Sequence, residues 1–216
     1  MDETIDFPTD GGTTTATGRL FAAAGGAGLG VLVLPDDEGL TPHVRDLCGR
    51  LVEEGFTALA PDVTEPPAAD LRATAETLVG AADRLRTHDA VRGEGVAVLG
   101  FGRGAGLALW LAFLLPGQVR AVVPFYGLPR EGSQPDLDRI DAAVEGHFAE
   151  NDDTVPPGAV QALETELADL GKDVRMFTYP GTSHGFFDDT RADRYDAEAA
   201  RQAWVRTLEF LRAKLG

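Results

Sequence analysis

The amino-acid sequence predicts an α/β fold with a mainly parallel central sheet and helices on both faces. Short apolar segments typical of strands alternate along the chain with longer segments whose apolar residues recur at helical spacing. Residues 28–34 form an uninterrupted apolar run, as expected for a strand that is covered on both faces of a sheet. This alternation is typical of strand–helix–strand units. We expect one domain over residues 1–216, a length that accommodates a single large core.

Turn-forming residues divide the first half of the chain into elements. Gly55 ends a helical segment, and Pro61 stops the strand that follows it. Asp70 is expected to cap the next long helix. The expected elements are strands at residues 14–21, 28–34 and 57–60, and helices at residues 44–54 and 70–88.

Proline and glycine also separate the elements of the second half. Pro116 and Gly117 close an apolar helix, whereas Pro156 and Pro157 stand at the start of another. The last helix repeats apolar residues at helical spacing over residues 200–215. The expected elements are strands at 96–99, 121–123, 144–149 and 174–179, helices at 104–115, 157–170 and 193–215, and a loop over 127–138.

The charge balance of the chain is strongly acidic. It holds 35 aspartates and glutamates against 19 lysines and arginines, and its formal net charge is -16. Because phosphate groups are bound by clustered lysines and arginines, we expect no nucleic acid and no anionic membrane as a partner. Lysine is scarce, with Lys172 and Lys214 alone. A high-salt cytoplasm and a GC-rich coding bias with a solvated acidic surface explain this composition equally well.

Three further features favour a cytoplasmic protein without a metal or cofactor. The first residues are acidic and lack the basic and apolar stretches of a secretory signal, and no apolar run is long enough to span a membrane. The single cysteine, Cys48, excludes an internal disulfide and is expected in the core. The four histidines are too scattered for metal-ligand spacing. We expect a monomer or a homodimer.

A glycine-rich turn follows the strand expected at residues 96–99. Gly100 and Gly104 occupy the two glycine positions of the nucleophile elbow G-x-S-x-G, a sharp strand-to-helix turn that lifts a nucleophile above the sheet. The central position is Gly102, which has no side chain to attack a carbonyl carbon. The same turn also fits the dinucleotide pattern G-x-G-x-x-A. That alternative is less favoured, because the turn is not the first of the fold and no acidic residue follows the next strand.

Two polar segments follow later strands. Asp152 comes after the strand expected at 144–149, and His184 follows the strand expected at 174–179. Because the carboxyl ends of parallel strands meet at one edge of a sheet, we expect these side chains to lie near Gly102. A buried acid would fix the imidazole tautomer, and the imidazole would deprotonate a nucleophile. Asp153, beside Asp152, is an alternative acid.

These segments resemble the dienelactone hydrolase family, which has the α/β-hydrolase fold, in the same order over roughly residues 14–215. The resemblance implies that Asp152 is the triad acid, that His184 is the triad base and that Gly102 stands at the nucleophile position. The matching residues are Leu99, Gly100, Phe101 and Gly104 at the elbow, Asp152, Val155 and Pro156 at the acid, Tyr179, Pro180, Gly181, His184, Gly185 and Phe186 at the histidine, and Gly39, Glu53, Glu54, Gly55, Phe56, Pro61 and Asp62 earlier in the chain.

The resemblance also implies the surroundings of this triad. It places an oxyanion hole at the backbone N–H groups of Arg103 and Asp37, and an acidic residue near the nucleophile at Asp36. Phe101 and Tyr126 are expected to line the pocket with Asp36. The substrate implied by the family is a small-molecule ester or lactone.

The sequence departs from the family at three places. The family carries cysteine or serine where this chain has Gly102, and its type member has a substrate-binding arginine where this chain has Asp188. The segment after Asp62 is short and rich in proline. The expected function is therefore an ester or lactone hydrolase scaffold with an incomplete triad, weakly active or inactive. A non-catalytic small-ligand-binding pseudoenzyme and a variant of an active hydrolase from which the nucleophile was removed are the alternatives.

Overall fold

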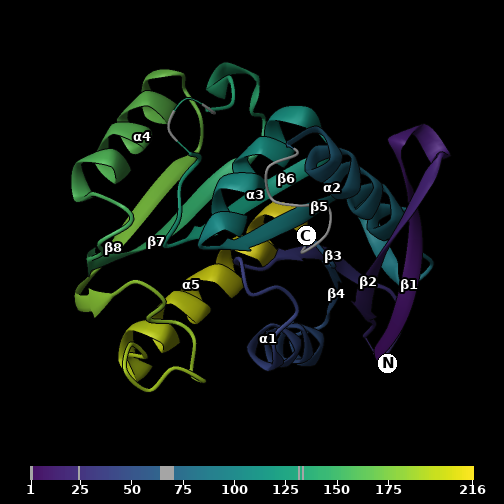
Figure 1. Ribbon diagram of the computed structural model, residues 1–216, viewed down its shortest axis with the longest axis horizontal. Coiled ribbons are helices and arrows are strands. Elements are labelled where there is room, and N and C mark those ends of the chain that lie inside the picture. Colours follow the sequence, from purple (N-terminus) through teal and green to yellow (C-terminus); the bar gives the residue numbers. More distant parts are fainter. Residues whose placement is uncertain (1, 24, 64–70, 131, 133) are drawn as a thin grey trace.

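The structure is a computed structural model that describes residues 2–23, 25–63, 71–130, 132 and 134–216. Its centre is an eight-stranded sheet with the strand order β1-β2-β4-β3-β5-β6-β7-β8 (Figure 1). The six strands from β4 to β8 in this order are parallel, whereas β2 is antiparallel to both β1 and β4. The predicted mainly parallel sheet is thus confirmed. The strands are β1 (Asp2–Thr9), β2 (Thr14–Phe21), β3 (Gly28–Leu34), β4 (Phe56–Pro61), β5 (Val91–Phe101), β6 (Val119–Phe125), β7 (Ala143–Asn151) and β8 (Val174–Ser183).

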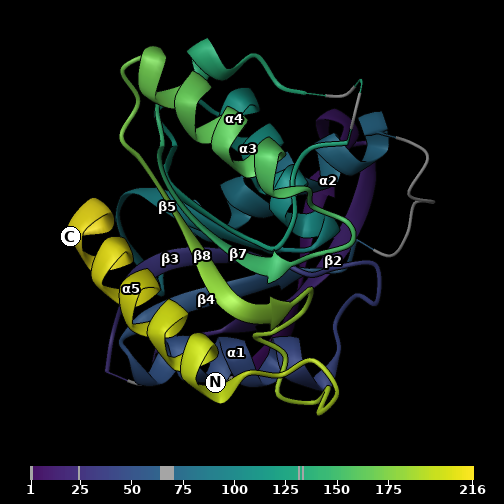
Figure 2. The same cartoon turned by 90° about the vertical axis from the view of Figure 1, so that its left-hand side faces the viewer.

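Five α-helices cover the two faces of the sheet. Helices α1 and α5 lie on one face, and α2, α3 and α4 lie on the other (Figures 1 and 2). The helices are α1 (Pro42–Glu53), α2 (Leu71–Arg86), α3 (Arg103–Leu114), α4 (Pro157–Asp169) and α5 (Ala197–Leu215), with short 3₁₀ turns η1 (Asp10–Gly12) and η2 (Leu137–Arg139). Helices on both faces explain why all residues of β3 are buried.

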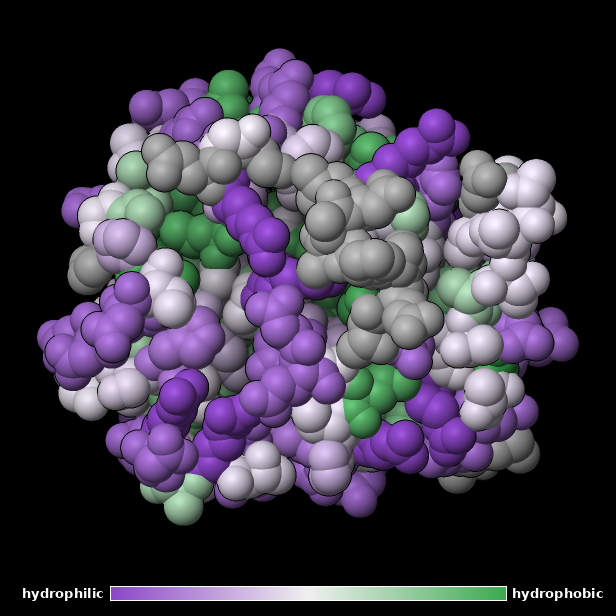
Figure 3. Space-filling view, viewed as in Figure 1, coloured by the Kyte–Doolittle hydropathy of each residue, from purple (hydrophilic) through white to green (hydrophobic). Residues whose placement is uncertain are grey.

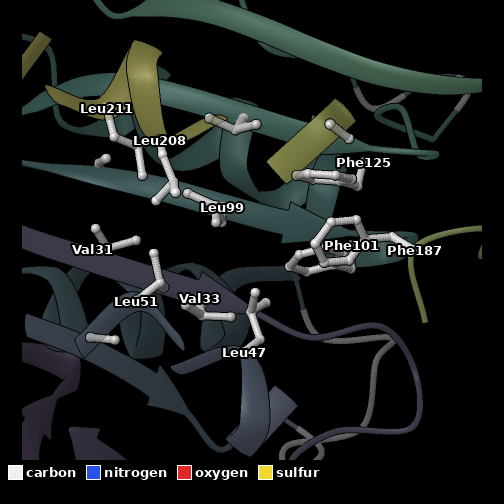
Figure 4. Packing of buried hydrophobic residues seen from close by; sticks show 14 of the residues in the cluster. Val31, Val33, Leu47, Leu51, Leu99, Phe101, Phe125, Phe187, Leu208 and Leu211 are labelled. Carbon is white, nitrogen blue, oxygen red and sulfur yellow. The ribbon is translucent and has the colours of Figure 1, made fainter. Parts of the chain in front are cut away.

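The core is divided by the sheet into two layers because successive side chains of a strand point to opposite faces. On β3, Val31 and Val33 pack with Leu99 of β5 against helices α1 and α5 (Figure 4). Leu32 and Leu34 point to the other face and pack toward α2 and α3. Each such side chain contributes about 1.5–3 kcal/mol when fully buried. Helix α3 is apolar all round since it lies on the middle of the sheet.

The structure differs from the sequence prediction mainly at element ends. Strand β1 was not predicted; it pairs with β2 and turns Ile5 and Phe7 inward between exposed acidic and polar residues. Helix α5 begins at Ala197 and not at residue 193, because the side chain of Asp196 caps it by accepting a hydrogen bond from Ala199 N at 2.9 Å. The predicted cap Asp70 lies outside the described residues.

The surface seen in Figure 3 is mostly hydrophilic, and its hydrophobic side chains form small separate groups. Large hydrophobic side chains are exposed at only three of the described positions, namely Leu170, Tyr195 and Val205. None of the described helices combines the length and the apolar character required to cross a membrane.

Candidate active site

Gly102 is the single residue between strand β5 and helix α3. Its backbone has φ 50° and ψ -117°, a left-handed conformation that glycine adopts without a Cβ penalty. The turn is held by hydrogen bonds from Gly102 N to Phe125 O at 3.0 Å and from Ala105 N to Gly102 O at 3.1 Å. The predicted strand-to-helix turn at this position is therefore present, with its central residue raised above the end of the sheet.

The glycines on either side of this turn are required by close backbone contacts. A Cβ on Gly100 would overlap the carbonyl oxygen of Gly104, and a Cβ on Gly104 would overlap Leu34 O and lie 2.5 Å from Pro35 O. Helix α3 can approach β3 and β5 this closely only because these positions lack side chains. The close approach fixes the first turn of α3 above the end of β3.

His184 and Asp152 form a hydrogen-bonded pair beside this turn. His184 Nδ1 lies 3.0 Å from Asp152 Oδ2, and the Asp152 side chain is only 1% exposed. Burial alone raises the pKa of Asp152, but hydrogen bonds from His184 and Thr154 outweigh it and hold the pKa below its ordinary value. An ionised Asp152 favours the His184 tautomer in which Nδ1 carries the ring proton. The lone pair on His184 Nε2 is then free.

Thr154 is a member of this arrangement that the sequence interpretation missed. Its hydroxyl lies 2.7 Å from Asp152 Oδ1 and 2.9 Å from His184 Nδ1, so it contacts both members of the pair. The backbone N–H groups of Thr154 and Val155 also donate to Asp152 Oδ1, at 2.8 Å and 3.0 Å. Aspartate at position 152 favours an Asx turn with the backbone two residues on, but this signal does not single out the threonine side chain.

The free nitrogen of His184 faces the position that a nucleophile would occupy. A Cβ on Gly102 would lie 3.8 Å from His184 Nε2 and 3.3 Å from Asp36 Cβ, with no other contact within 4 Å among the described residues. Residue 102, the imidazole and Asp36 therefore converge on one small space, as the sequence predicted for these three positions. In this chain no side chain of residue 102 fills that space.

Asp36 is a half-buried carboxyl at the end of β3. Its Oδ1 accepts a hydrogen bond from Glu38 N at 2.9 Å. Burial raises the pKa of Asp36; the nearby carboxylates of Asp188 and Asp37 raise it further, and the Arg191 guanidinium opposes them. The folded protein therefore binds a proton at Asp36 more tightly than the unfolded chain does.

We expect Asp36→Asn to stabilise the protein at neutral pH. Because the folded pKa is raised, this group contributes most to stability below its ordinary value of 3.8, and that contribution is lost as the pH rises through the folded pKa. Asparagine does not ionise but keeps an oxygen for Glu38 N. In thermal unfolding, the melting temperature of the variant minus that of the parent protein should therefore grow as the pH is raised from acidic to neutral. A difference that is constant or falls with pH would contradict this, and Asp153→Asn controls for loss of one charge.

The two residues whose backbone N–H groups are expected to form an oxyanion hole, Arg103 and Asp37, both line one cleft. Arg103 begins α3, where a backbone N–H has no partner within the helix. Within the described part of the chain, Asp37 N donates no hydrogen bond either. The side chains of the same two residues are linked, with Arg103 Nε 3.4 Å from Asp37 Oδ1. This ion pair ties the β3 loop to the start of α3.

A cleft of about 410 Å³ opens over Gly102 and His184. Its lining combines polar residues, among them Asp36 and His184, with the apolar residues Leu107, Trp110, Leu128, Pro129 and Val155. Trp110 comes from helix α3 and is only partly buried. The predicted pocket residue Tyr126 lines the cleft; its φ of 38° is unusual for a residue with a side chain, and its ring lies 5.1 Å from that of His184.

Phe101 is a correction to the predicted pocket. It is 4% exposed and stacks on Phe125 at 4.8 Å between ring centroids, and it does not line the cleft. The reason is the alternation of side chains on β5, which turns Phe101 to the same side as Leu99, into the layer under α1 and α5 (Figure 4).

Asp188, at a position where the resemblance led us to note a departure from the family, contacts a histidine. Its Oδ1 lies 3.4 Å from His43 Nδ1, and Asp189 Oδ1 lies 3.3 Å from the same nitrogen. Arg191 Nε is 3.6 Å from the second oxygen of Asp188. His43, Asp188 and Asp189 are the one group in the described part of the chain whose ligand atoms, all within 4.8 Å of one another, could hold a metal ion. Arg191 also partly compensates the charge of Asp188.

Comparisons with known proteins agree on the fold and on the family. A family model for the dienelactone hydrolase family matches residues 17–215. Protein usf of Aquifex pyrophilus is 30% identical over 207 residues, which cover 87% of this chain and 89% of the relative. A protein of Synechocystis sp. named as a candidate carboxymethylenebutenolidase is 28% identical, with 86% of each chain covered. Among solved structures, a dienelactone hydrolase-like promiscuous phosphotriesterase from metagenomic libraries has a TM-score of 0.84 and 26% identity, covering 100% of this chain and 99% of the other.

Proposed function

The chain belongs to the dienelactone hydrolase family, and from this premise we propose that it hydrolyses a small ester or lactone slowly, without a covalent intermediate. The observation that carries this proposal is the 3.8 Å between His184 Nε2 and the Cβ position of residue 102. The base therefore faces a space where a family nucleophile would stand, and a water molecule fits the same role. Asp152, which is hydrogen-bonded to His184 Nδ1, is the acid of the pair.

In the proposed reaction, His184 Nε2 takes a proton from a water molecule held beside Gly102. The hydroxide oxygen forms a bond to the carbonyl carbon, and the carbonyl electron pair moves to its oxygen. The backbone N–H groups of Arg103 and Asp37 donate to that oxyanion. The tetrahedral intermediate then collapses, the bond to the alkoxide breaks, and the imidazolium returns the proton to the leaving oxygen. Asp152 stabilises the imidazolium between these steps.

The expected rate is far below that of a complete triad. An oxyanion hole and binding alone leave an acceleration on the order of 10³ over water when a triad member is missing. The polar residues of the cleft carry the chemistry, and its apolar residues, such as Trp110 and Leu128, suit the hydrocarbon part of a small substrate.

His184→Ala is expected to lower the remaining ester hydrolysis by about 10²-fold, the lower range of general-base catalysis. Turnover of a nitrophenyl ester by the purified chain measures it, with the uncatalysed rate subtracted. Ser183→Ala is the matched control, because Ser183 is the exposed neighbour of the histidine in the chain. Equal rates for the parent protein and His184→Ala would remove the hydrolase proposal.

A non-catalytic ligand-binding role is the second candidate. Gly102 supports it, because the vacant space enlarges the cleft and carries no nucleophile. Under this role the cleft retains a small lactone or ester without converting it. A ligand that raises the melting temperature of the parent protein and is recovered intact would favour this role over slow hydrolysis.

A further inference from the structure

We propose that the same cleft also removes protons from carbon, and that it isomerises small β,γ-unsaturated lactones through a bound enolate. The inference rests on the base and the oxyanion hole of the proposed function, but it requires no hydrolysis. It follows from the absence of a side chain at Gly102, which leaves the base His184 Nε2 3.8 Å from the Cβ position of a residue without a nucleophile.

The space beside Gly102 is where a substrate carbon would lie in this reaction. A carbon–carbon single bond measures about 1.5 Å, close to the bond that joins an attacking oxygen to the carbonyl carbon in a tetrahedral intermediate. A carbonyl whose oxygen reaches the N–H groups of Arg103 and Asp37 can therefore place its α-carbon where a nucleophilic oxygen would otherwise stand. His184 Nε2 is the base within reach of a carbon in that space, since it lies 3.8 Å from the Cβ position of residue 102.

The charge that develops on enolisation has the same location as the charge in ester hydrolysis. Both reactions place a negative charge on the former carbonyl oxygen, so donors suited to one serve the other. Both also leave a proton on the imidazole, next to Asp152 at 3.0 Å from Nδ1. A serine or cysteine at residue 102 would add to the carbonyl carbon first. Glycine removes that competing step.

The proposed step conserves atoms and electrons. His184 Nε2 takes the α-proton, the C–H electron pair forms a double bond between the α-carbon and the carbonyl carbon, and the carbonyl pair moves to oxygen. In a β,γ-unsaturated lactone the resulting dienolate is conjugated. The imidazolium then returns a proton to the γ-carbon, which gives the α,β-unsaturated isomer, or to the α-carbon, which restores the substrate. No oxidant, reductant or cofactor takes part.

The test uses α-angelica lactone, a small β,γ-unsaturated lactone, with the full-length protein in D₂O. Proton NMR separates three outcomes in one sample, namely deuterium at the α-carbon, the α,β-unsaturated isomer and the ring-opened 4-oxopentanoate. We expect the parent protein to accelerate deuterium incorporation and isomerisation over buffer. His184→Ala should lose this acceleration by about 10²-fold, whereas Ser183→Ala should retain it. Equal rates for the parent protein and His184→Ala overturn the proposal.

Gly102→Ala tests the vacant space itself. Its methyl group would occupy the space without adding a nucleophile, so isomerisation should fall about tenfold or more with no gain in hydrolysis. A variant whose circular dichroism matches the parent and whose isomerisation is undiminished overturns the inference. The two proposals fail separately. Formation of 4-oxopentanoate without deuterium incorporation or isomer refutes only the carbon-acid activity. Deuterium incorporation and isomer without 4-oxopentanoate refute only the hydrolase.

Discussion

Gly102→Ser is expected to raise ester hydrolysis on the order of 10³-fold in kcat/KM. A hydroxyl at residue 102 would stand beside His184 Nε2, which lies 3.8 Å from the Cβ position and has Asp152 on its other nitrogen. Serine then attacks the carbonyl carbon directly, and hydrolysis proceeds in two easier steps through an acyl-enzyme. The nucleophile is among the most costly triad members to lose, so its restoration should recover a large part of the rate.

The new side chain has a cost in stability that is small beside this gain. A residue with a Cβ at φ 50° and ψ -117° is strained by about 1–3 kcal/mol, and the Cβ would lie 3.3 Å from that of Asp36. Asp36 belongs to the loop after β3 and can move by a few tenths of an ångström. We therefore expect an active but less stable protein, the usual exchange between activity and stability.

The measurement is kcat/KM on a nitrophenyl ester, together with the mass of an acyl-enzyme trapped at low pH. Gly102→Ala is the matched control, because it adds the same strain without a nucleophile and should gain no hydrolysis. Gly102→Cys should also form an acyl-enzyme. A folded Gly102→Ser protein with neither adduct nor gain would show that His184 is not placed to deprotonate residue 102.

The elements of the fold were predictable where one physical signal dominated. Residues 28–34 are apolar throughout, and β3 occupies this range because both faces of the strand are covered. Strand β1 was missed, since its acidic residues and Pro8 obscure the alternation of Ile5 and Phe7. Its place depends on pairing with β2, which local sequence does not encode. The start of α5, predicted at residue 193, was wrong for a local reason, because the residue that caps the helix is Asp196.

The site was predictable in part, because the triad order and the strand ends could be read from the chain. Gly102, Asp152 and His184 lie at the ends of three parallel strands, and the edge of a parallel sheet brings such residues together. To place Phe101 correctly, one would have had to know which face of its strand is turned toward the cleft. Thr154 and the contact of His43 with Asp188 depend on side-chain packing between segments far apart in the sequence, at 2.9 Å and 3.4 Å respectively.

Gly104→Ala is expected to destabilise the protein by about 4 kcal/mol or more, among the largest effects of a single substitution. The added methyl group would overlap Leu34 O and lie 2.5 Å from Pro35 O and 2.8 Å from Leu34 C. These atoms belong to the buried end of β3 and the loop that carries Asp36, where the strand pairs in register with β5. Helix α3 would have to move away from the sheet, and the N–H of Arg103 would move with it.

Urea unfolding at neutral pH measures this effect as a lower midpoint with an unchanged slope. Gly49→Ala is the matched control, because Gly49 lies inside helix α1 and an added Cβ meets nothing within 4 Å among the described residues. There the same substitution should stabilise the protein by about 0.5–1 kcal/mol, the usual preference of a helix for alanine over glycine. A soluble Gly104→Ala protein that unfolds at the parent's midpoint would mean that α3 does not rest on β3 this closely. The oxyanion position assigned to Arg103 would then have no structural support.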